Sequence, residues 1–230
     1  MDESKLIFFT GAPGSKWSAV AHILTHTKKI SINTSDYNDD RVYTHPGPKI
    51  SHLGAYWGPG FEFGSNFHEL HTLTKEQIIE QIEKPYADNN WEQYRLIKCH
   101  QFSLNLDFIT KMFPKSVIIN VLRPDDICLW SWYVAGGFEG IKYPDYNPYY
   151  KNKETMAEKI AEENYLARKF IIEKNLPLEV ATLDYWNRIW GIQPNTDELE
   201  RYMNSLLLRK GDAGPVPLLD TQVSVYNMPI

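Results

Sequence analysis

The sequence predicts a single-domain α/β fold of three layers, in which helices cover both faces of a central parallel sheet. Short apolar runs alternate with longer amphipathic segments, and this alternation is typical of crossover connections between parallel strands. The chain of 230 residues is long enough to bury a substantial core. Because it contains neither a repeat nor a low-complexity tract, we predict one domain over residues 1–230.

The first predicted strand and helix flank a glycine-containing turn. Residues 6–10 are a short, aromatic-rich apolar run typical of a buried strand, and residues 17–24 follow with helical spacing. The glycines and proline of residues 11–16 favour a tight turn. Such a loop directs backbone N–H groups, a helix dipole and the Lys16 ammonium at one point. We therefore predict a P-loop-like strand–loop–helix that binds phosphate or sulfate, although a plain connecting turn explains the glycines equally well.

The next part of the chain is predicted to contain a long loop and an amphipathic helix. Residues 28–33 are compatible with a short strand, whereas residues 34–70 show no sustained period and predict a loop. The aromatic residues of this loop favour a packed lid, and a surface crossover is the alternative. Residues 74–77 have the form of a capping box, which predicts a helix that ends at Pro85.

Further strands and helices complete the expected sheet. We predict strands at 94–98, 116–122 and 178–183, and helices at 103–113, 124–135, 153–174 and 195–210. The long helix is expected to bury a stripe formed by Met156, Ile160, Tyr165, Leu166 and Phe170. A second loop is expected around residues 136–150, and residues 215–230 are expected to form an extended tail.

Composition and charge argue against several classes of protein. The net charge of −5 disfavours a general nucleic-acid binder but is compatible with a local basic pocket. No apolar stretch approaches the ~20 residues that span a bilayer, and Asp2 and Glu3 replace the basic start of a signal peptide. Cys99 and Cys128 cannot form a disulfide framework, which fits a reducing compartment. We therefore expect a cytoplasmic protein with no nucleic-acid partner and no membrane span.

Polar and cationic residues follow three of the predicted strands. Residues 11–18 follow the first, Lys98 and His100 follow another, and Arg123 follows a third. In open α/β sheets, ligands bind beyond the carboxyl ends of the strands. A neutral His100 can accept a proton from an attacking hydroxyl, and Lys98 can stabilise charge on a transferred group. A surface histidine is the simpler explanation when His100 is considered alone.

Arg123 and Ser131 are separated by two helical turns at the start of a predicted helix. Both side chains can therefore reach a phosphate that lies beside that helix. A local ion pair of Arg123 with Asp125 or Asp126 is the alternative.

Near the end of the chain, Arg209, Lys210 and Gly211 form another cationic group. Their simple explanation is structural, because cations followed by glycine are favoured at helix C-termini.

Taken together, these motifs resemble the sulfotransferases that use 3′-phosphoadenosine-5′-phosphosulfate (PAPS), in particular the cytosolic type. Residues 14–17 (GSKW) are similar to the end of the family's PKSGTTW loop, which holds the 5′-phosphosulfate, and residues 98–100 (KCH) resemble its K-T-H segment. Arg123 and Ser131 match the pair that holds the 3′-phosphate, and residues 209–214 match the family's R-K-G-x-x-G loop. These four motifs occur in the family's order and span residues 6–214.

The resemblance implies a sulfotransferase that transfers a sulfuryl group from PAPS to a hydroxyl or amine of a small-molecule or glycan acceptor and releases 3′-phosphoadenosine-5′-phosphate (PAP). It implies His100 as general base, with Lys98 and Lys16 stabilising charge, and it requires no metal. The cofactor-binding residues that it implies are Gly11, Gly14, Ser15, Lys16, Trp17, Ser18, Arg123, Ser131, Arg209, Lys210 and Gly211.

Two alternatives remain open at this point. Ala12 stands where the family's loop has its lysine, so either Lys16 supplies this charge or transfer is weak or absent. A non-catalytic PAP- or PAPS-binding homologue is therefore one alternative. The other is a P-loop nucleotide kinase or hydrolase with magnesium on Ser18, but Trp17 separates Lys16 from Ser18, whereas the nucleotide-binding motif places them side by side.

Overall fold

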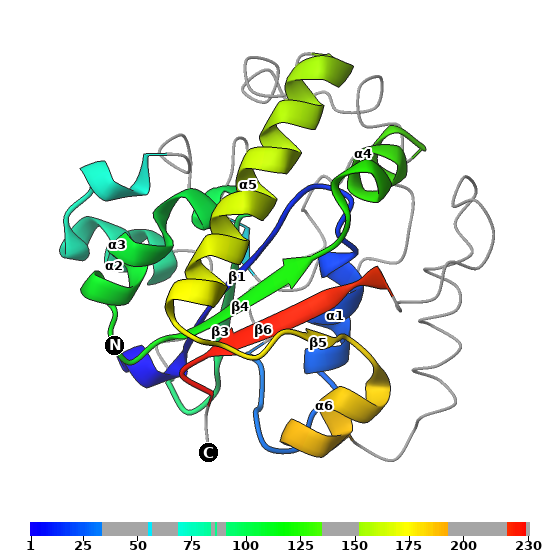
Figure 1. Cartoon of the computed structure of the whole chain (residues 1–230). Coiled ribbons are helices and arrows are strands. Elements are labelled where there is room, and N and C mark those ends of the chain that lie inside the picture. Colours follow the sequence, from blue (N-terminus) through cyan, green and yellow to red (C-terminus); the bar gives the residue numbers. More distant parts are fainter. Residues whose placement is uncertain are drawn as a thin grey trace.

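The computed structural model describes residues 1–33, 55–56, 69–83, 86, 91–134, 152–192 and 220–228, which form a mixed α/β fold (Figure 1). Its strands are β1 (Leu6–Gly11), β2 (Ala55–Tyr56), β3 (Arg95–Lys98), β4 (Val117–Leu122), β5 (Glu179–Val180) and β6 (Gln222–Tyr226). Its α-helices are α1 (Trp17–Leu24), α2 (Lys75–Glu83), α3 (Leu106–Met112), α4 (Asp125–Val134), α5 (Lys153–Glu173) and α6 (Leu183–Trp190). Short 3₁₀ helices are η1 (Glu3–Lys5), η3 (Leu70–Thr72) and η4 (His100–Asn105).

The described strands form one six-stranded sheet in the order β2-β3-β1-β4-β6-β5. Strands β3, β1 and β4 run parallel to one another, as predicted for an α/β fold. The short strand β2, which lies within the predicted loop at 34–70, also pairs parallel with β3. Strand β6 is antiparallel to both β4 and β5, so the sheet is mostly rather than wholly parallel. The carboxyl ends of β1, β3 and β4 consequently lie at one edge of the sheet, where α1, η4 and α4 begin.

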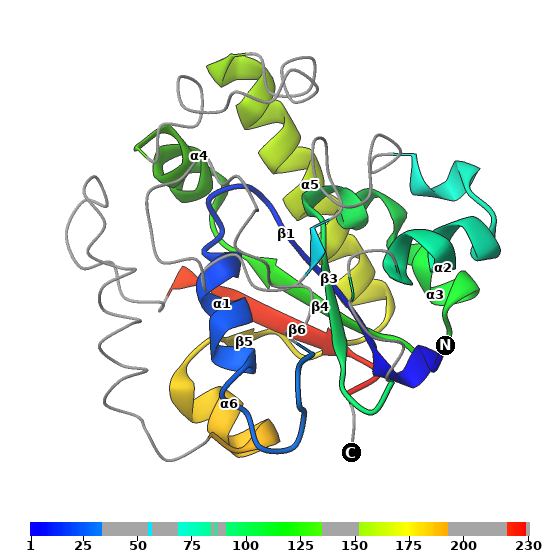
Figure 2. The same cartoon turned by 180° about the vertical axis from the view of Figure 1, so that it is seen from behind.

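The side chains of β1 divide the core between the two faces of the sheet. Ile7 and Phe9 belong to a cluster with α1 and α6, whereas Leu6 and Phe8 belong to a cluster with α2, α3 and Phe170 of α5. Figure 1 shows α5 crossing one face, and Figure 2 shows α1 and α6 on the other. A strand that is covered on both faces is apolar at successive positions, which explains why residues 6–10 were recognisable in the sequence.

Three segments differ from their sequence-based predictions. Residues 183–190 form α6, which was not predicted; the Thr182 hydroxyl caps it by accepting a hydrogen bond from the Tyr185 N–H at 3.1 Å. Residues 222–226, expected within an extended tail, are extended but form the interior strand β6 between β4 and β5. In addition, residues 28–33 form only an isolated bridge between Ile32 and Tyr94 rather than a strand.

The buried stripe of α5 also differs from the prediction. Met156, Ile160 and Phe170 are buried, but Tyr165 is 66% exposed, and Glu163 and Asn164 are buried instead. The helix therefore presents two polar side chains toward the interior next to the carboxyl edge of the sheet.

The capping box of α2 is confirmed. The Gln77 side-chain oxygen accepts from the Thr74 N–H at 2.9 Å, and the Thr74 hydroxyl accepts from the Gln77 N–H at 3.3 Å. None of the helices in the described part of the chain is long and apolar enough to cross a membrane. The predicted helix at 195–210, the loop at 136–150 and most of the lid at 34–70 lie outside the described residues.

Candidate functional site

The loop between β1 and α1 packs closely against α4. Gly14 has a φ angle of +83°, which favours glycine, and a Cβ atom at this position would lie 2.0 Å from the Cys128 carbonyl oxygen. The loop also closes on itself, because the Ser15 N–H donates to the Ala12 carbonyl at 3.0 Å. Glycine is therefore required at position 14 both by backbone conformation and by the close approach of α4.

Lys16 is an unusual residue at the start of α1. It occupies the N-cap position in a left-handed conformation, with φ of 66°, and its side chain makes no capping hydrogen bond. The first N–H groups of a helix lack intrahelical acceptors, and most N-cap residues offer a side-chain oxygen to them. Lys16 brings a positive charge instead, so the start of α1 is suited to an external anion.

His100 joins the end of β3 to the end of β1. Its Nδ1 lies 2.5 Å from the Gly11 carbonyl oxygen. Because a carbonyl oxygen can only accept a hydrogen bond, Nδ1 carries the proton, and in the neutral ring Nε2 carries the lone pair. The imidazole also stacks on Trp17, with ring centroids 3.9 Å apart and an interplanar angle of 27°.

The backbone around His100 is held from two sides. The Thr10 hydroxyl donates to the His100 carbonyl at 2.9 Å, and the Ser103 hydroxyl donates to the same oxygen at 3.1 Å. The His100 side chain is 5% exposed. The imidazole is thus fixed in position within the wall of the site rather than projecting from its surface.

The Lys98 ammonium, like the His100 imidazole, lies near the Trp17 ring. Its Nζ lies 6.0 Å from the Trp17 ring centroid, and its side chain is 3% exposed. Cys99, between them, packs in the apolar cluster on the α3 side of the sheet, as the alternation of an extended chain predicts. Burial raises the pKa of the Cys99 thiol well above its usual range, so this residue is unsuited to act as a nucleophile.

Arg123 connects the loop, α4 and the start of β6. Its Nη1 donates to the Gly14 carbonyl at 3.2 Å and to the Ser131 hydroxyl at 2.8 Å, and its Nη2 lies 3.0 Å from Asp220 Oδ2. The Arg123 side chain is 1% exposed. The alternative expectation of a local pair with Asp125 or Asp126 is wrong, because the carboxylate that contacts Arg123 comes from far along the chain.

Sequence reasoning did not identify several polar residues around this site. Asn164 of α5 donates to the Arg123 carbonyl at 3.0 Å and to Asp125 Oδ1 at 2.6 Å. Gln101, directly after His100, donates to Glu163 Oε1 at 3.2 Å. The signal that could have revealed Glu163 and Asn164 is their position in the buried stripe of α5, where they follow Met156 and Ile160 at helical spacing.

The other predicted site residues are less directly involved. Ser15 is buried, and its hydroxyl oxygen would lie 2.7 Å from a Cβ atom on Gly11, so it points back into the packed loop. Ser18 is half-buried at the second position of α1. Arg209, Lys210 and Gly211 lie outside the described residues.

Ala12 packs into an apolar cluster rather than facing the start of α1. Its neighbours in this cluster are Cys128, Trp132, Met156 and Ile160, and it is 2% exposed. A longer, charged side chain at position 12 would enter this cluster. In the loop of residues 11–16, the positive charge belongs to Lys16.

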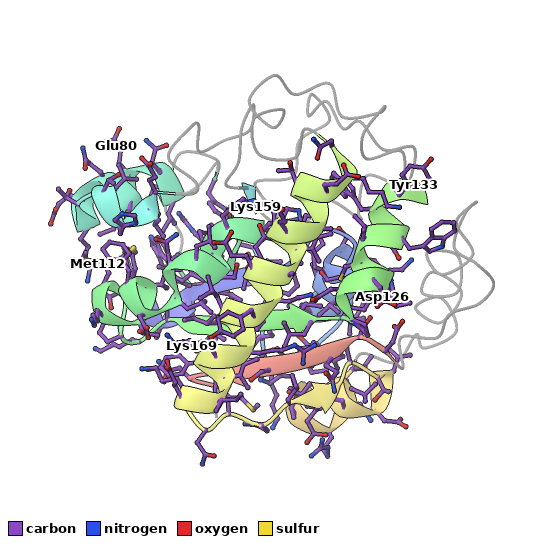
Figure 3. All side chains as sticks on the ribbon, turned by 45° about the horizontal axis from the view of Figure 1, so that its top comes forward. Glu80, Met112, Asp126, Tyr133, Lys159 and Lys169 are labelled. Atoms are coloured by element: carbon purple, nitrogen blue, oxygen red, sulfur yellow. The ribbon has the colours of Figure 1, made fainter. Side chains whose placement is uncertain are left out.

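Within the described ranges, no group of three or more His, Cys, Asp or Glu side chains is arranged to hold a metal ion. Asp125 is engaged by Asn164, and Asp126 is exposed on the outer side of α4 (Figure 3).

Comparisons of the chain with family models, with curated proteins and with solved structures found no match. The geometry of this site and the resemblance of its motifs are therefore the basis for the function proposed below.

Proposed function

We propose that this protein is a PAPS-dependent sulfotransferase that transfers a sulfuryl group to an acceptor hydroxyl or amine. One observation carries the proposal: residues that are distant in sequence meet at the carboxyl edge of the sheet. His100 contacts Gly11 and Trp17 on one side of the loop, while Arg123 contacts Gly14 and Ser131 on the other. Ligands of open α/β sheets bind at this edge.

The residues suit a nucleotide with two separate anionic groups. The start of α1, with Lys16 at its N-cap, is suited to the 5′-phosphosulfate. Arg123 and Ser131 are suited to the 3′-phosphate, and Arg123 Nε is buried without a hydrogen-bond partner, so the guanidinium has a donor that an oxyanion can use. Bound PAPS would supply an activated sulfuryl group.

The chain's own residues would provide base catalysis and a positive field. The Nε2 lone pair of His100 would accept the acceptor's proton, and donation from Nδ1 to the Gly11 carbonyl would keep the ring oriented and stabilise the imidazolium that results. Lys16 and Lys98 would stabilise negative charge that moves toward the leaving phosphate. The chemistry requires no metal.

A non-catalytic PAP-binding protein is the second candidate. The observations that favour it are the 5% exposure of His100 and the 3% exposure of Lys98, together with Ala12 in place of the family's loop lysine. Such a protein would keep the anion-binding residues without transferring the sulfuryl group.

Transfer of label from radiolabelled PAPS to a panel of phenols and sugars tests the proposal, alongside calorimetric titration with PAP. We expect turnover in the wild type and a transfer rate about 10²–10⁴-fold lower in His100→Ala. The control His71→Ala should keep the wild-type rate, because His71 is exposed on η3. Tight PAP binding without transfer would establish the second candidate. Absence of PAP binding would overturn both, and magnesium-dependent ATP hydrolysis would indicate a nucleotide hydrolase instead.

A further inference from the structure

The ion pair between Arg123 and Asp220 is incompletely hydrogen-bonded. Nη2 of the guanidinium contacts Asp220 Oδ2 at 3.0 Å, yet Arg123 Nε and Asp220 Oδ1 are both buried without hydrogen-bond partners. An arginine and a carboxylate in their strongest geometry share two parallel hydrogen bonds. This pair therefore makes one of the two parallel hydrogen bonds that an arginine and a carboxylate can share.

The edge of the guanidinium formed by Nε and Nη2 is the edge that an oxyanion can occupy. Nη1 is already engaged by the Gly14 carbonyl and the Ser131 hydroxyl, which fix the plane of the group. Two oxygens of a phosphate could accept from Nε and Nη2 together, whereas the Asp220 carboxylate takes Nη2 alone. A phosphate and Asp220 cannot both occupy this edge, because two anions in hydrogen-bond contact with one group repel each other.

Asp220 is also the more accessible member of the pair. Its side chain is 23% exposed, against 1% for Arg123, so release of the carboxylate returns a partly solvated group to water. A phosphate monoester carries about −1.5 to −2 charges at neutral pH, more than the single charge of a carboxylate. A phosphate should therefore bind Arg123 more strongly than the Asp220 carboxylate does.

From these contacts we infer that Asp220 is a specificity-determining residue that competes with the ligand for Arg123. This inference rests on the proposed function, because it concerns the 3′-phosphate of the same nucleotide. A 3′-phosphate displaces the carboxylate and takes both donors of the edge, the unpartnered Nε and the released Nη2, whereas a 3′-hydroxyl leaves the Arg123–Asp220 pair intact. Asp220 thereby lowers the affinity for every ligand that needs Arg123 and leaves ligands that do not need it unaffected.

Calorimetric titrations with PAP and with adenosine 5′-phosphate (AMP) test this inference in the full chain. The two nucleotides share the adenosine and the 5′-phosphate, and only PAP has a 3′-phosphate. Asp220→Asn keeps a side-chain oxygen that can accept from Arg123 but removes the charge. We expect it to tighten PAP binding about tenfold, the effect of one charged hydrogen bond, and to leave AMP binding unchanged.

Asp125→Asn is the matched control, because Asp125 is also acidic and near the site but is engaged by Asn164 rather than by Arg123. It should leave both affinities unchanged. Asp220→Ser removes the carboxylate without adding an amide and should also tighten PAP binding. If one of the two Asp220 variants fails to fold, the other still tests the inference.

The outcomes are distinguishable. Equal tightening of PAP and AMP would show a general electrostatic effect and would overturn the inference, as would weaker PAP binding in both Asp220 variants. Either result would leave the proposed function standing, since the wild type would still bind PAP. If neither the wild type nor the variants bind PAP, the proposed function fails and the inference fails with it.

Discussion

The imidazole of His100 is bound to the carbonyl oxygen of Gly11 through Nδ1, across 2.5 Å. This contact joins the ends of two neighbouring parallel strands, so the position of the histidine depends on the register between β1 and β3. In that register Phe9 lies opposite Lys98, which brings Gly11 and His100, each two residues further on, to the same level. The catalytic assignment proposed for His100 therefore depends on the sheet rather than on the histidine's own loop.

Gly14→Ala should destabilise the fold strongly. The substitution forces a left-handed conformation on alanine and places its Cβ 2.0 Å from the Cys128 carbonyl oxygen. We expect a loss of about 2–4 kcal/mol in the free energy of unfolding, from backbone strain and overpacking together. Denaturant unfolding measures this loss.

The matched control is Gly191→Ala, because Gly191 also has a positive φ, of +63°, but its nearest neighbour is the Lys28 side chain at 3.7 Å. This variant should lose less than Gly14→Ala, about 1–3 kcal/mol, because the backbone conformation of Gly191 (φ 63°, ψ 146°) is disfavoured for alanine but no close contact is added. An equal loss in both variants would contradict the close packing of the loop against α4.

Lys16→Gly should separate stability from anion binding. Glycine relieves the left-handed strain of about 1–2 kcal/mol but restores chain entropy to the unfolded state at a cost of about 0.5–1 kcal/mol. The free energy of unfolding should therefore rise by no more than about 1.5 kcal/mol. Loss of the ammonium should weaken PAP binding about tenfold, as measured by calorimetry.

Asn175→Gly serves as the control for Lys16→Gly, since Asn175 has a φ of 51° at the end of α5, away from the loop. It should leave PAP affinity unchanged. PAP affinity that is unaltered in Lys16→Gly would remove Lys16 from the binding site.

Stability should fall as the pH is lowered below neutrality, because His22 of α1 resists protonation in the folded state. Burial, with a contribution from the neighbouring His26, lowers the pKa of His22 from 6.5 to about 4. The unfolded chain takes up the proton near pH 6.5 and the folded chain only near pH 4, so stability is complete above this window and is lost within it as the pH falls.

Urea unfolding at pH 7 and pH 5 should therefore show a loss of about 1–2 kcal/mol in the wild type. His22→Gln removes the titrating group and should reduce this loss. The same pH dependence in wild type and variant would assign the effect to other groups.

The two cysteines should be unreactive in the native protein. Burial raises the pKa of the Cys128 thiol to about 12 and that of the Cys99 thiol well above its usual range, so neither forms a thiolate at neutral pH. An Ellman-type thiol reagent should label neither residue until guanidinium unfolds the chain, when both should react. Rapid labelling of the folded protein at either position would contradict this packing.

Much of the central sheet is predictable from local sequence. Strand β4 is apolar at nearly every position because it is buried on both faces, and this continuous pattern is visible without any knowledge of its neighbours. Helix α6 was missed because it has only eight residues and is rich in aromatic side chains, which favour strands. Its stability depends on burying Trp186 and Trp190 against α1 and the sheet, which is a tertiary effect.

Local sequence is enough to place a glycine turn, Lys98, His100 and Arg123 after strands, because strand patterns and turn residues act over a few neighbouring positions. Parallel pairing then implied that these strand ends share an edge. The folded structure is needed to see that Asp220 is the carboxylate at Arg123, that Trp17 stacks on His100, and that Glu163 and Asn164 point inward. These contacts join segments far apart in the chain, and their formation depends on how β6 and α5 pack against the sheet, which local patterns do not encode.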